Sequence, residues 1–236
     1  MAAAPMLNLR RDPEAAQIVE LVREMKAIRI GYQIELKNGA PGPWVGARDK
    51  DVVGKSIEEG VCAYVSSQIP AFVKGPNPGA SPDAVNSTYA YELKAFWAKG
   101  QPGFDLANFD SLVCNAAKDG GVRQLLETLY LIVAYDWDAE SGTATFESVW
   151  LLPIWALPLY SGKYPLSLQS KRQTWYNLRP GVTSGWRDAD RTPQRFIAAL
   201  CKAVDECPNK GIVEKKDSLI ASITSQFAAL KTDPQD

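Results

Sequence analysis

The segment Tyr130-Leu-Ile-Val-Ala-Tyr-Asp-Trp137, followed by Asp138-Ala-Glu-Ser-Gly142 and Thr143-Ala-Thr-Phe-Glu-Ser-Val-Trp150, decides the fold expected for this chain. Two apolar and aromatic runs flank a short polar stretch that ends in glycine, which is typical of two antiparallel strands joined by a turn. This is the strongest hairpin pattern in the sequence. We therefore predict a β-hairpin at the centre of the protein.

Helical patterns dominate on both sides of this hairpin. Asp12 and Pro13 are suited to begin a helix in which Ile18, Val22 and Met25 repeat at helical spacing, and Ser56 with Glu59 forms a capping box. Residues 30–36 suit either a strand or a continuing helix. Further helices are expected at 56–68, 90–98, 106–117, 122–129, from Pro193 to Pro208 and at 213–231. The expected fold class is α+β, predominantly helical, with a central β-hairpin or small antiparallel sheet.

The length of 236 residues favours one globular domain. We expect an arm at 1–12, a domain over 13–231 with a proline- and glycine-rich hinge loop at 74–88, and a tail at 232–236. The longest apolar run, 149–160, is interrupted by Pro153 and Pro158, so no membrane span is expected. The N-terminus lacks the order of a secretion signal and the four cysteines form no CxxC pair. These features predict a cytoplasmic protein, or one within a virus-like or other assembly.

Histidine is absent from the whole chain. Its absence excludes Ser-His-Asp and Cys-His catalysis and zinc sites that use histidine. The phosphate-binding glycine loops and the serine-hydrolase elbow are also missing. An enzyme would have to rely on carboxylates, lysine or tyrosine, and the sequence predicts no cofactor and no metal site.

The spacing Glu-x-Lys is typical of metal-dependent nucleases, in which carboxylates hold Mg²⁺ and a lysine helps to orient the attacking water. It occurs at Glu35-Leu-Lys37, Glu92-Leu-Lys94 and Glu214-Lys-Lys216. A pattern that occurs three times in a charged chain is close to chance, and no acidic residue stands on an evident strand before Glu35. We interpret these pairs as surface ion pairs.

The hairpin offers a second catalytic candidate. Asp136 and Asp138 share a face if their segment is a strand, and Glu147 lies on the opposing strand. Paired carboxylates beside tryptophans are what a glycosidase requires. Acidic residues next to a turn are more often solvated strand ends, so a carboxylate-dependent hydrolase is kept as an alternative function.

Charge is distributed unevenly in the second half of the chain. Residues 124–162 carry five acidic side chains and no basic one, whereas residues 163–195 carry seven basic and two acidic side chains. Cations interleaved with flat rings are typical of single-stranded nucleic-acid binding. The candidate nucleic-acid-binding residues are Lys171, Arg172, Trp175, Tyr176, Arg179, Trp186 and Arg187.

The apolar segment 150–160 is a candidate partner surface, with Trp150, Ile154, Trp155 and Leu159 as its contacts. Together with the opposed charge blocks, it favours a homo-oligomer. The sequence thus predicts a non-enzymatic, self-assembling structural protein that coats or binds single-stranded nucleic acid, like a nucleocapsid subunit. The alternatives are the histidine-free carboxylate-dependent hydrolase and a protein–protein adaptor.

Overall fold

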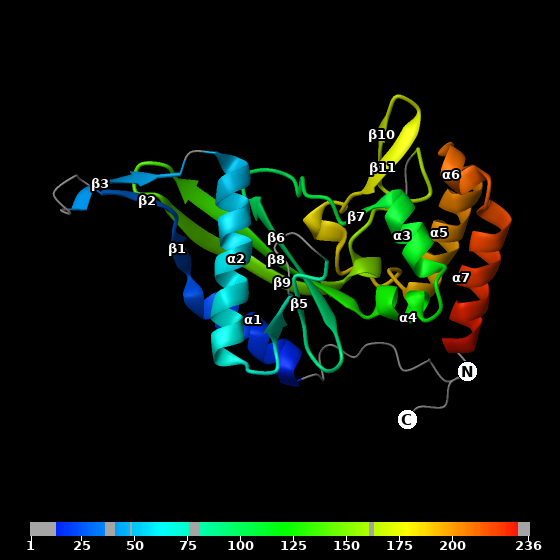
Figure 1. Ribbon diagram of the computed structural model, residues 1–236, viewed down its shortest axis with the longest axis horizontal. Helices are drawn as coiled ribbons and strands as arrows, with labels where there is room; N and C mark the ends of the chain where they lie inside the picture. Colours follow the sequence, from blue (N-terminus) through cyan, green and yellow to red (C-terminus); the bar gives the residue numbers. More distant parts are fainter. Residues whose placement is uncertain (1–12, 36–40, 48, 76–80, 161–162, 231–236) are drawn as a thin grey trace. The chain divides into compact units, whose positions relative to one another are not determined.

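The computed structural model describes residues 13–35, 41–47, 49–75, 81–160 and 163–230 (Figure 1). These residues form two compact units. The sheet unit comprises residues 13–101 and 130–151, and the helical unit comprises residues 102–129 and 152–230, apart from the gaps just given. The predicted arm and tail lie outside the described residues, so the division at 1–12, 13–231 and 232–236 stays a prediction.

The sheet unit is organised around six strands in the order β1 (Ala27–Arg29), β9 (Thr143–Pro153), β8 (Thr128–Asp138), β6 (Ala90–Trp97), β5 (Ala84–Val85) and β4 (Val73–Lys74). The two strands predicted around the central turn lie within β8 and β9. They are the middle of a larger sheet, however, so the prediction of a predominantly helical protein with one hairpin is wrong. Residues 129–135 of β8 are buried without interruption, which indicates that both faces of this strand are covered.

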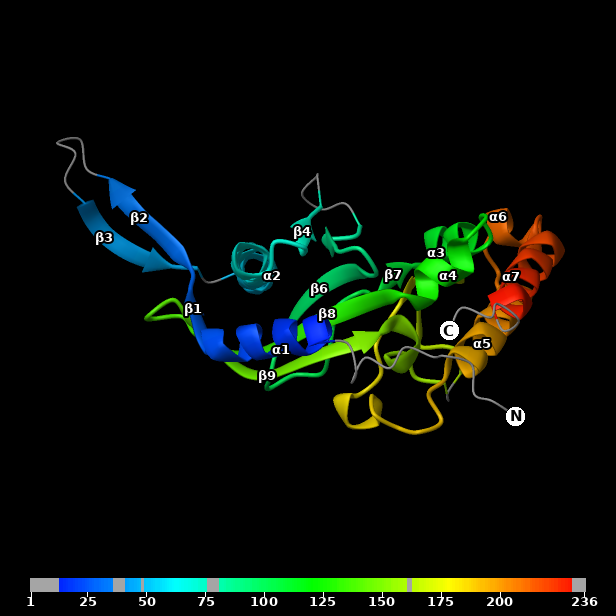
Figure 2. The ribbon, with the colours of Figure 1, turned by 90° about the horizontal axis from the view of Figure 1, so that it is seen from below.

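Two helices and a small hairpin complete the sheet unit. Helix α2 (Lys50–Gln68) buries Val53, Ile57, Val61 and Val65 at four-residue intervals and packs on β6 and β4. Figure 2 looks almost along the axis of α2, with the strands beside it. Helix α1 (Pro13–Met25) buries Ala15, Ile18 and Val22 and contacts α2. The segment around residues 30–36, which suits either a strand or a helix, contains strand β2 (Gly31–Glu35), which pairs with β3 (Pro41–Gly46).

The prediction of a helix over residues 90–98 is wrong, because residues 90–97 form strand β6. Ala, Glu, Leu and Lys favour a helix in isolation. In the fold, β6 lies between β8 and β5 in the sheet, and its register with β5 pairs Tyr91 with Ala84 and Ala90 with Val85. Tertiary pairing therefore outweighs local propensity here. The expected hinge loop at 74–88 contains β5, and residues 76–80 of that loop lie outside the described part of the chain.

The helical unit contains five α-helices among its described residues: α3 (Phe109–Ala116), α4 (Gly121–Leu126), α5 (Pro193–Glu206), α6 (Lys210–Val213) and α7 (Lys216–Leu230). Helices α5 and α7 lie side by side in Figures 1 and 2, and α7 also contacts α3 and α4. A three-stranded sheet has the order β10 (Leu168–Lys171), β11 (Thr174–Leu178) and β7 (Ala107–Asn108). Short 3-10 turns lie at Ile154–Ala156 and Thr183–Gly185.

Asn209 joins the small sheet to the helices of this unit. Its side chain accepts a hydrogen bond from Trp175 N and donates to Trp175 O, both at 2.8 Å, and it also donates to Asp110 Oδ1 at 2.6 Å. One buried amide thus fixes β11 against α3 and the start of α6. Among the helices of the described residues, none combines the length and apolarity that crossing a bilayer requires.

Candidate active site

Asp83 directly precedes β5, which pairs with β6. The antiparallel register pairs Ala84 with Tyr91, so continuing it by one residue places Asp83 opposite Glu92. The Oδ2 atom of Asp83 accepts a hydrogen bond from Leu93 N at 2.8 Å. The pairing of β5 with β6 therefore brings Asp83 next to Glu92.

Glu92 is a buried carboxylate in the middle of β6, with only 7% of its surface exposed. The Ser81 hydroxyl donates a hydrogen bond to its Oε1 atom, and Lys94 Nζ lies 3.4 Å from its Oε2 atom. Burial raises the pKa of Glu92, Lys94 opposes this, and repulsion from Asp83 adds to the increase. Glu92 thus has one lysine as a partner and a second carboxylate, Asp83, close enough to repel it, so the site favours an additional cation.

Lys94 belongs to this site because alternate residues of a strand point to the same side. It lies two residues after Glu92, and its side chain is mostly covered, with 18% exposed. Leu93, between them, is buried on the other side of β6. The Glu92–Lys94 pair therefore presents an acceptor and a cation together, and Asp83 lies on the same edge.

Helix α2 contributes a third carboxylate. Glu58 Oε1 accepts a hydrogen bond from Ala95 N at 3.1 Å, and its Oε2 atom lies 3.4 Å from Lys55 Nζ. Leu93 and Ala95 are two residues apart, so their N–H groups leave β6 on the same edge, where Asp83 and Glu58 accept them. Burial raises the pKa of Glu58, Lys94 and Lys55 oppose this, and Asp83 adds to it.

The donor chemistry of this cluster fits Mg²⁺. Carboxylate oxygens are its preferred protein ligands, and it is commonly held by one or two carboxylates with the remaining positions filled by water and substrate phosphate. Within the described ranges, no three Asp, Glu, Cys or His side chains are grouped closely enough to hold a metal by themselves. The Asp83–Glu92 pair is therefore the candidate holder, with Lys94 next to it.

Comparison with known proteins identifies the family. Residues 14–227 match the family described as NgoBV restriction endonuclease. This match covers most of the chain. The chain belongs to the NgoBV restriction endonuclease family.

Relatives of this family agree with that placement. The type II restriction enzyme NlaIV of Neisseria lactamica is 30% identical over 142 residues, which are 57% of this chain and 56% of that enzyme. The type II restriction enzyme NgoBV of Neisseria gonorrhoeae is 25% identical over 130 residues, which are 53% of this chain and 71% of that enzyme. The match thus spans little more than half the length of NlaIV.

The solved structure of the NlaIV restriction endonuclease has a similar fold. The TM-score is 0.72 at 24% sequence identity, with 91% of this chain and 88% of that chain covered. The family match overturns the prediction of a non-enzymatic, nucleocapsid-like structural protein. That prediction was wrong because it was built on charge distribution, which describes a surface and carries no information about chemistry.

The sequence offered one partial signal for the candidate site. Glu92-Leu-Lys94 was one of three equivalent spacings, and Asp83 stood in a segment interpreted as a loop. Asp83, which directly precedes a short strand and lies nine positions before Glu92, distinguishes this copy, but the signal requires β6 to be recognised as a strand. Glu35 ends β2, while Leu36 and Lys37 lie outside the described residues. Lys216 contacts Asp205 instead, with Nζ 2.8 Å from Oδ1.

The carboxylates of the central hairpin have other partners. Asp136 accepts hydrogen bonds from Lys99 Nζ at 2.9 Å and Trp97 Nε1 at 3.2 Å, and these contacts lower its pKa. Asp138 accepts from the Ser141 hydroxyl at 2.6 Å and from Glu140 N at 2.9 Å, which lowers its pKa and closes the turn. Neither has the raised pKa that a glycosidase acid needs.

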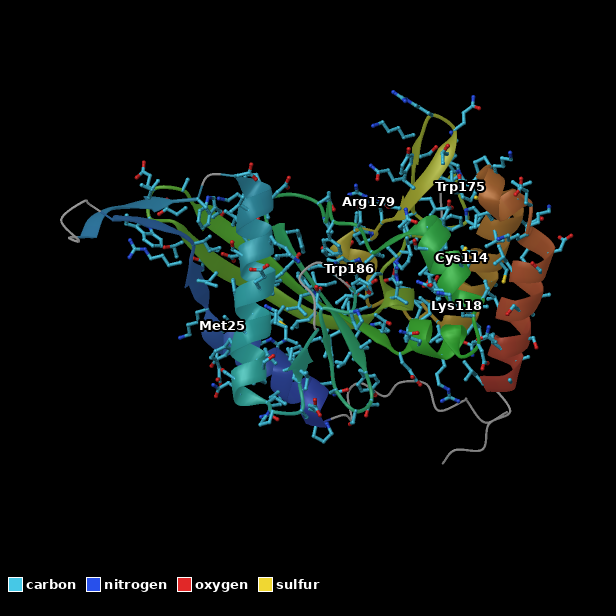
Figure 3. The ribbon with its side chains drawn as sticks, in the orientation of Figure 1. Met25, Cys114, Lys118, Trp175, Arg179 and Trp186 are labelled. Atoms are coloured by element: carbon cyan, nitrogen blue, oxygen red, sulfur yellow. The ribbon has the colours of Figure 1, made fainter. Side chains whose placement is uncertain are left out.

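The predicted nucleic-acid-binding residues all lie in the helical unit, and most of them lie on β10–β11. Trp175 is buried in β11 and Trp186 is buried after the second 3-10 turn, so neither ring is free to stack on a base (Figure 3). Arg179 is bound to Asp105, with Nε 2.7 Å from Oδ1. The exposed members of the set are Lys171, Arg172, Tyr176 and Arg187.

The predicted partner surface at residues 150–160 is mainly packed within the protein. Trp150 is half-buried and stacks on Phe96 in the sheet unit, with ring centroids 6.1 Å apart. Ile154 in the helical unit is buried, and Trp155 is partly so. Leu159 is the exposed member of the set, at 39%.

Proposed function

We propose that this chain is a Mg²⁺-dependent endonuclease that cleaves phosphodiester bonds of duplex DNA within a specific sequence. Membership of a restriction endonuclease family supports this proposal. The observation that carries it is the convergence of Asp83, Glu92 and Lys94 at the β5–β6 edge. The partner is thus duplex DNA, in place of the single-stranded nucleic acid expected from sequence.

The roles of the side chains follow from their chemistry. Asp83 and Glu92 would hold Mg²⁺, which polarises a phosphate oxygen and makes a bound water more acidic. Lys94 places a positive charge beside this pair, where it offsets charge on the scissile phosphate and orients the attacking water by hydrogen bonding. Glu58 holds the backbone of β6 through Ala95 N and so positions Glu92 and Lys94.

Cleavage of supercoiled plasmid DNA with and without Mg²⁺ tests the proposal. Glu92→Gln and Asp83→Asn are each expected to reduce the cleavage rate by about 100-fold or more, because a catalytic metal supplies several kcal/mol of transition-state stabilisation. Lys94→Met is expected to reduce the rate as well.

Glu214→Gln is the matched control. Glu214 has the same spacing to a lysine, but it is exposed at the end of α6 and far along the chain from β6. Cleavage should be unchanged in this variant. Wild-type protein without Mg²⁺-dependent cleavage, or a Glu92→Gln variant as active as the wild type, would contradict the proposal.

Two parts of the sequence hypothesis belong to this proposal and stay predictions. One is self-association into a homo-oligomer, which the opposed charge blocks favour. The other is a cytoplasmic location, where such an enzyme meets DNA.

A further inference from the structure

The turn between β10 and β11 has an unusual backbone. Lys171 pairs with Thr174, so the connection has two residues, Arg172 and Gln173, with φ values of 51° and 64°. Two consecutive residues in the left-handed region define a type I′ turn, for which Asn-Gly is the preferred sequence. Arg and Gln are strained in this conformation. Their presence calls for a reason beyond turn formation.

No partner in the described part of the chain supplies that reason. Residues 169–174 are all exposed. The side chains of Lys171, Arg172 and Gln173 make no hydrogen bond or ion pair with the described residues. Figure 3 shows long side chains extending away from the ribbon at the tip of this hairpin. The tip therefore carries two positively charged side chains and one amide side chain that stabilise no other part of the described fold.

The strand that follows the tip, in contrast, is firmly held at Trp175, which pairs with Ser170 next to the turn. Trp175 is buried and lies against Phe109 and Tyr164, with ring centroids 5.6 Å and 5.0 Å away. Its backbone N and O are both bonded to Asn209. Because the strand beside the turn is fixed, the exposed tip presents its side chains in one defined position, which is what selective recognition requires.

We propose that the recognition hairpin, residues 168–178, enters the major groove of duplex DNA and reads base edges with its tip. The major groove admits a two-stranded β-ribbon, and an arginine pairs with guanine O6 and N7 through two hydrogen bonds. Arg172 reads guanine, Gln173 makes a second base-edge contact, and Lys171 contacts a phosphate. This inference rests on the proposed function, since it names the element that recognises the substrate.

The double variant Arg172→Asn/Gln173→Gly separates recognition from folding. It installs the preferred type I′ pair, so the hairpin should be at least as stable as in the wild type while both contacts are lost. Each protein is incubated without divalent cations with duplexes whose central base pairs are randomised, and the bound duplexes are sequenced. The wild type should enrich a guanine-containing sequence, and the variant should lose about 10-fold or more of its preference for guanine at one position.

Two further variants make the result specific. Arg172→Lys keeps the charge but loses the double hydrogen bond, so overall affinity should persist while guanine preference falls. Lys202→Ala/Lys210→Ala removes two exposed cations from α5 and α6 of the same unit, and its preference should match that of the wild type.

The outcomes distinguish this inference from the proposed function. Enrichment that is the same in the wild type and the double variant overturns the hairpin proposal, even when the wild type cleaves DNA. Guanine preference that depends on Arg172, in a protein without cleavage activity, supports the hairpin and overturns the nuclease. A wild type that enriches no sequence overturns the hairpin proposal outright.

Discussion

At the scale of single residues, burial of the charged Glu92 carboxylate lowers the free energy of unfolding. Its pKa is raised by burial, so the folded state binds its proton more tightly than the unfolded state does. Stability therefore falls as the pH rises from the ordinary glutamate pKa, about 4.3, towards the raised value, and the loss persists at higher pH. Glu92→Gln should remove this loss and stabilise the protein at pH 8 by about 0.5–2 kcal/mol, while abolishing cleavage.

Thermal unfolding of the two proteins between pH 4 and pH 8 measures this effect. The melting temperature of Glu92→Gln should exceed that of the wild type by a few degrees at pH 8, and the difference should disappear near pH 4. Glu147→Gln is the control, because Glu147 is an exposed glutamate of β9 in the same unit. A Glu92→Gln variant that is less stable than the wild type at pH 8 would contradict this prediction, because it would show that the contacts with Ser81 and Lys94 outweigh the cost of burying the charge.

At the scale of elements, Asn209 decides whether β11 is held in place. Its side chain makes three hydrogen bonds in a buried position, two with the backbone of Trp175 and one with Asp110. Asn209→Ala removes this partner from the buried backbone N–H and C=O of Trp175, which costs about 1–3 kcal/mol for each. We expect a loss of at least about 2 kcal/mol in the free energy of unfolding, measured by urea denaturation. Asn115→Ala removes an exposed asparagine of α3 and should change stability by less than about 0.5 kcal/mol.

The sequence predicted elements where local and tertiary signals agree. The helices predicted from Pro13 and from Pro193 begin at these residues, and the first buries Ile18 and Val22 but leaves Met25 partly exposed. Residues 90–97 were mistaken for a helix because their propensity conflicts with their position between β8 and β5. The candidate site was missed for the same reason, since Asp83 and Glu92 become neighbours only when β5 and β6 pair. Spacing within one segment cannot reveal a site that two segments form.

At the scale of the whole molecule, the proposed active site predicts that Mg²⁺ raises the stability of the folded protein. Asp83 repels both Glu92 and Glu58 inside the sheet unit, and a cation bound there would relieve that repulsion only in the folded protein. At a Mg²⁺ concentration ten times the dissociation constant, the gain is about 1.4 kcal/mol, or about 3–6 °C in melting temperature for a chain of this size. The gain should saturate as Mg²⁺ is added.

Asp83→Asn provides the decisive comparison for this effect. It removes one of the two proposed Mg²⁺-binding carboxylates, while the asparagine oxygen can still accept the hydrogen bond from Leu93 N. Its melting temperature should not respond to Mg²⁺ beyond the response to KCl of equal ionic strength. An equal gain in the wild type and in Asp83→Asn would place the ion elsewhere on the molecule. The melting temperature detects Mg²⁺ binding in the absence of DNA, so this measurement tests the metal site independently of cleavage and of the recognition hairpin.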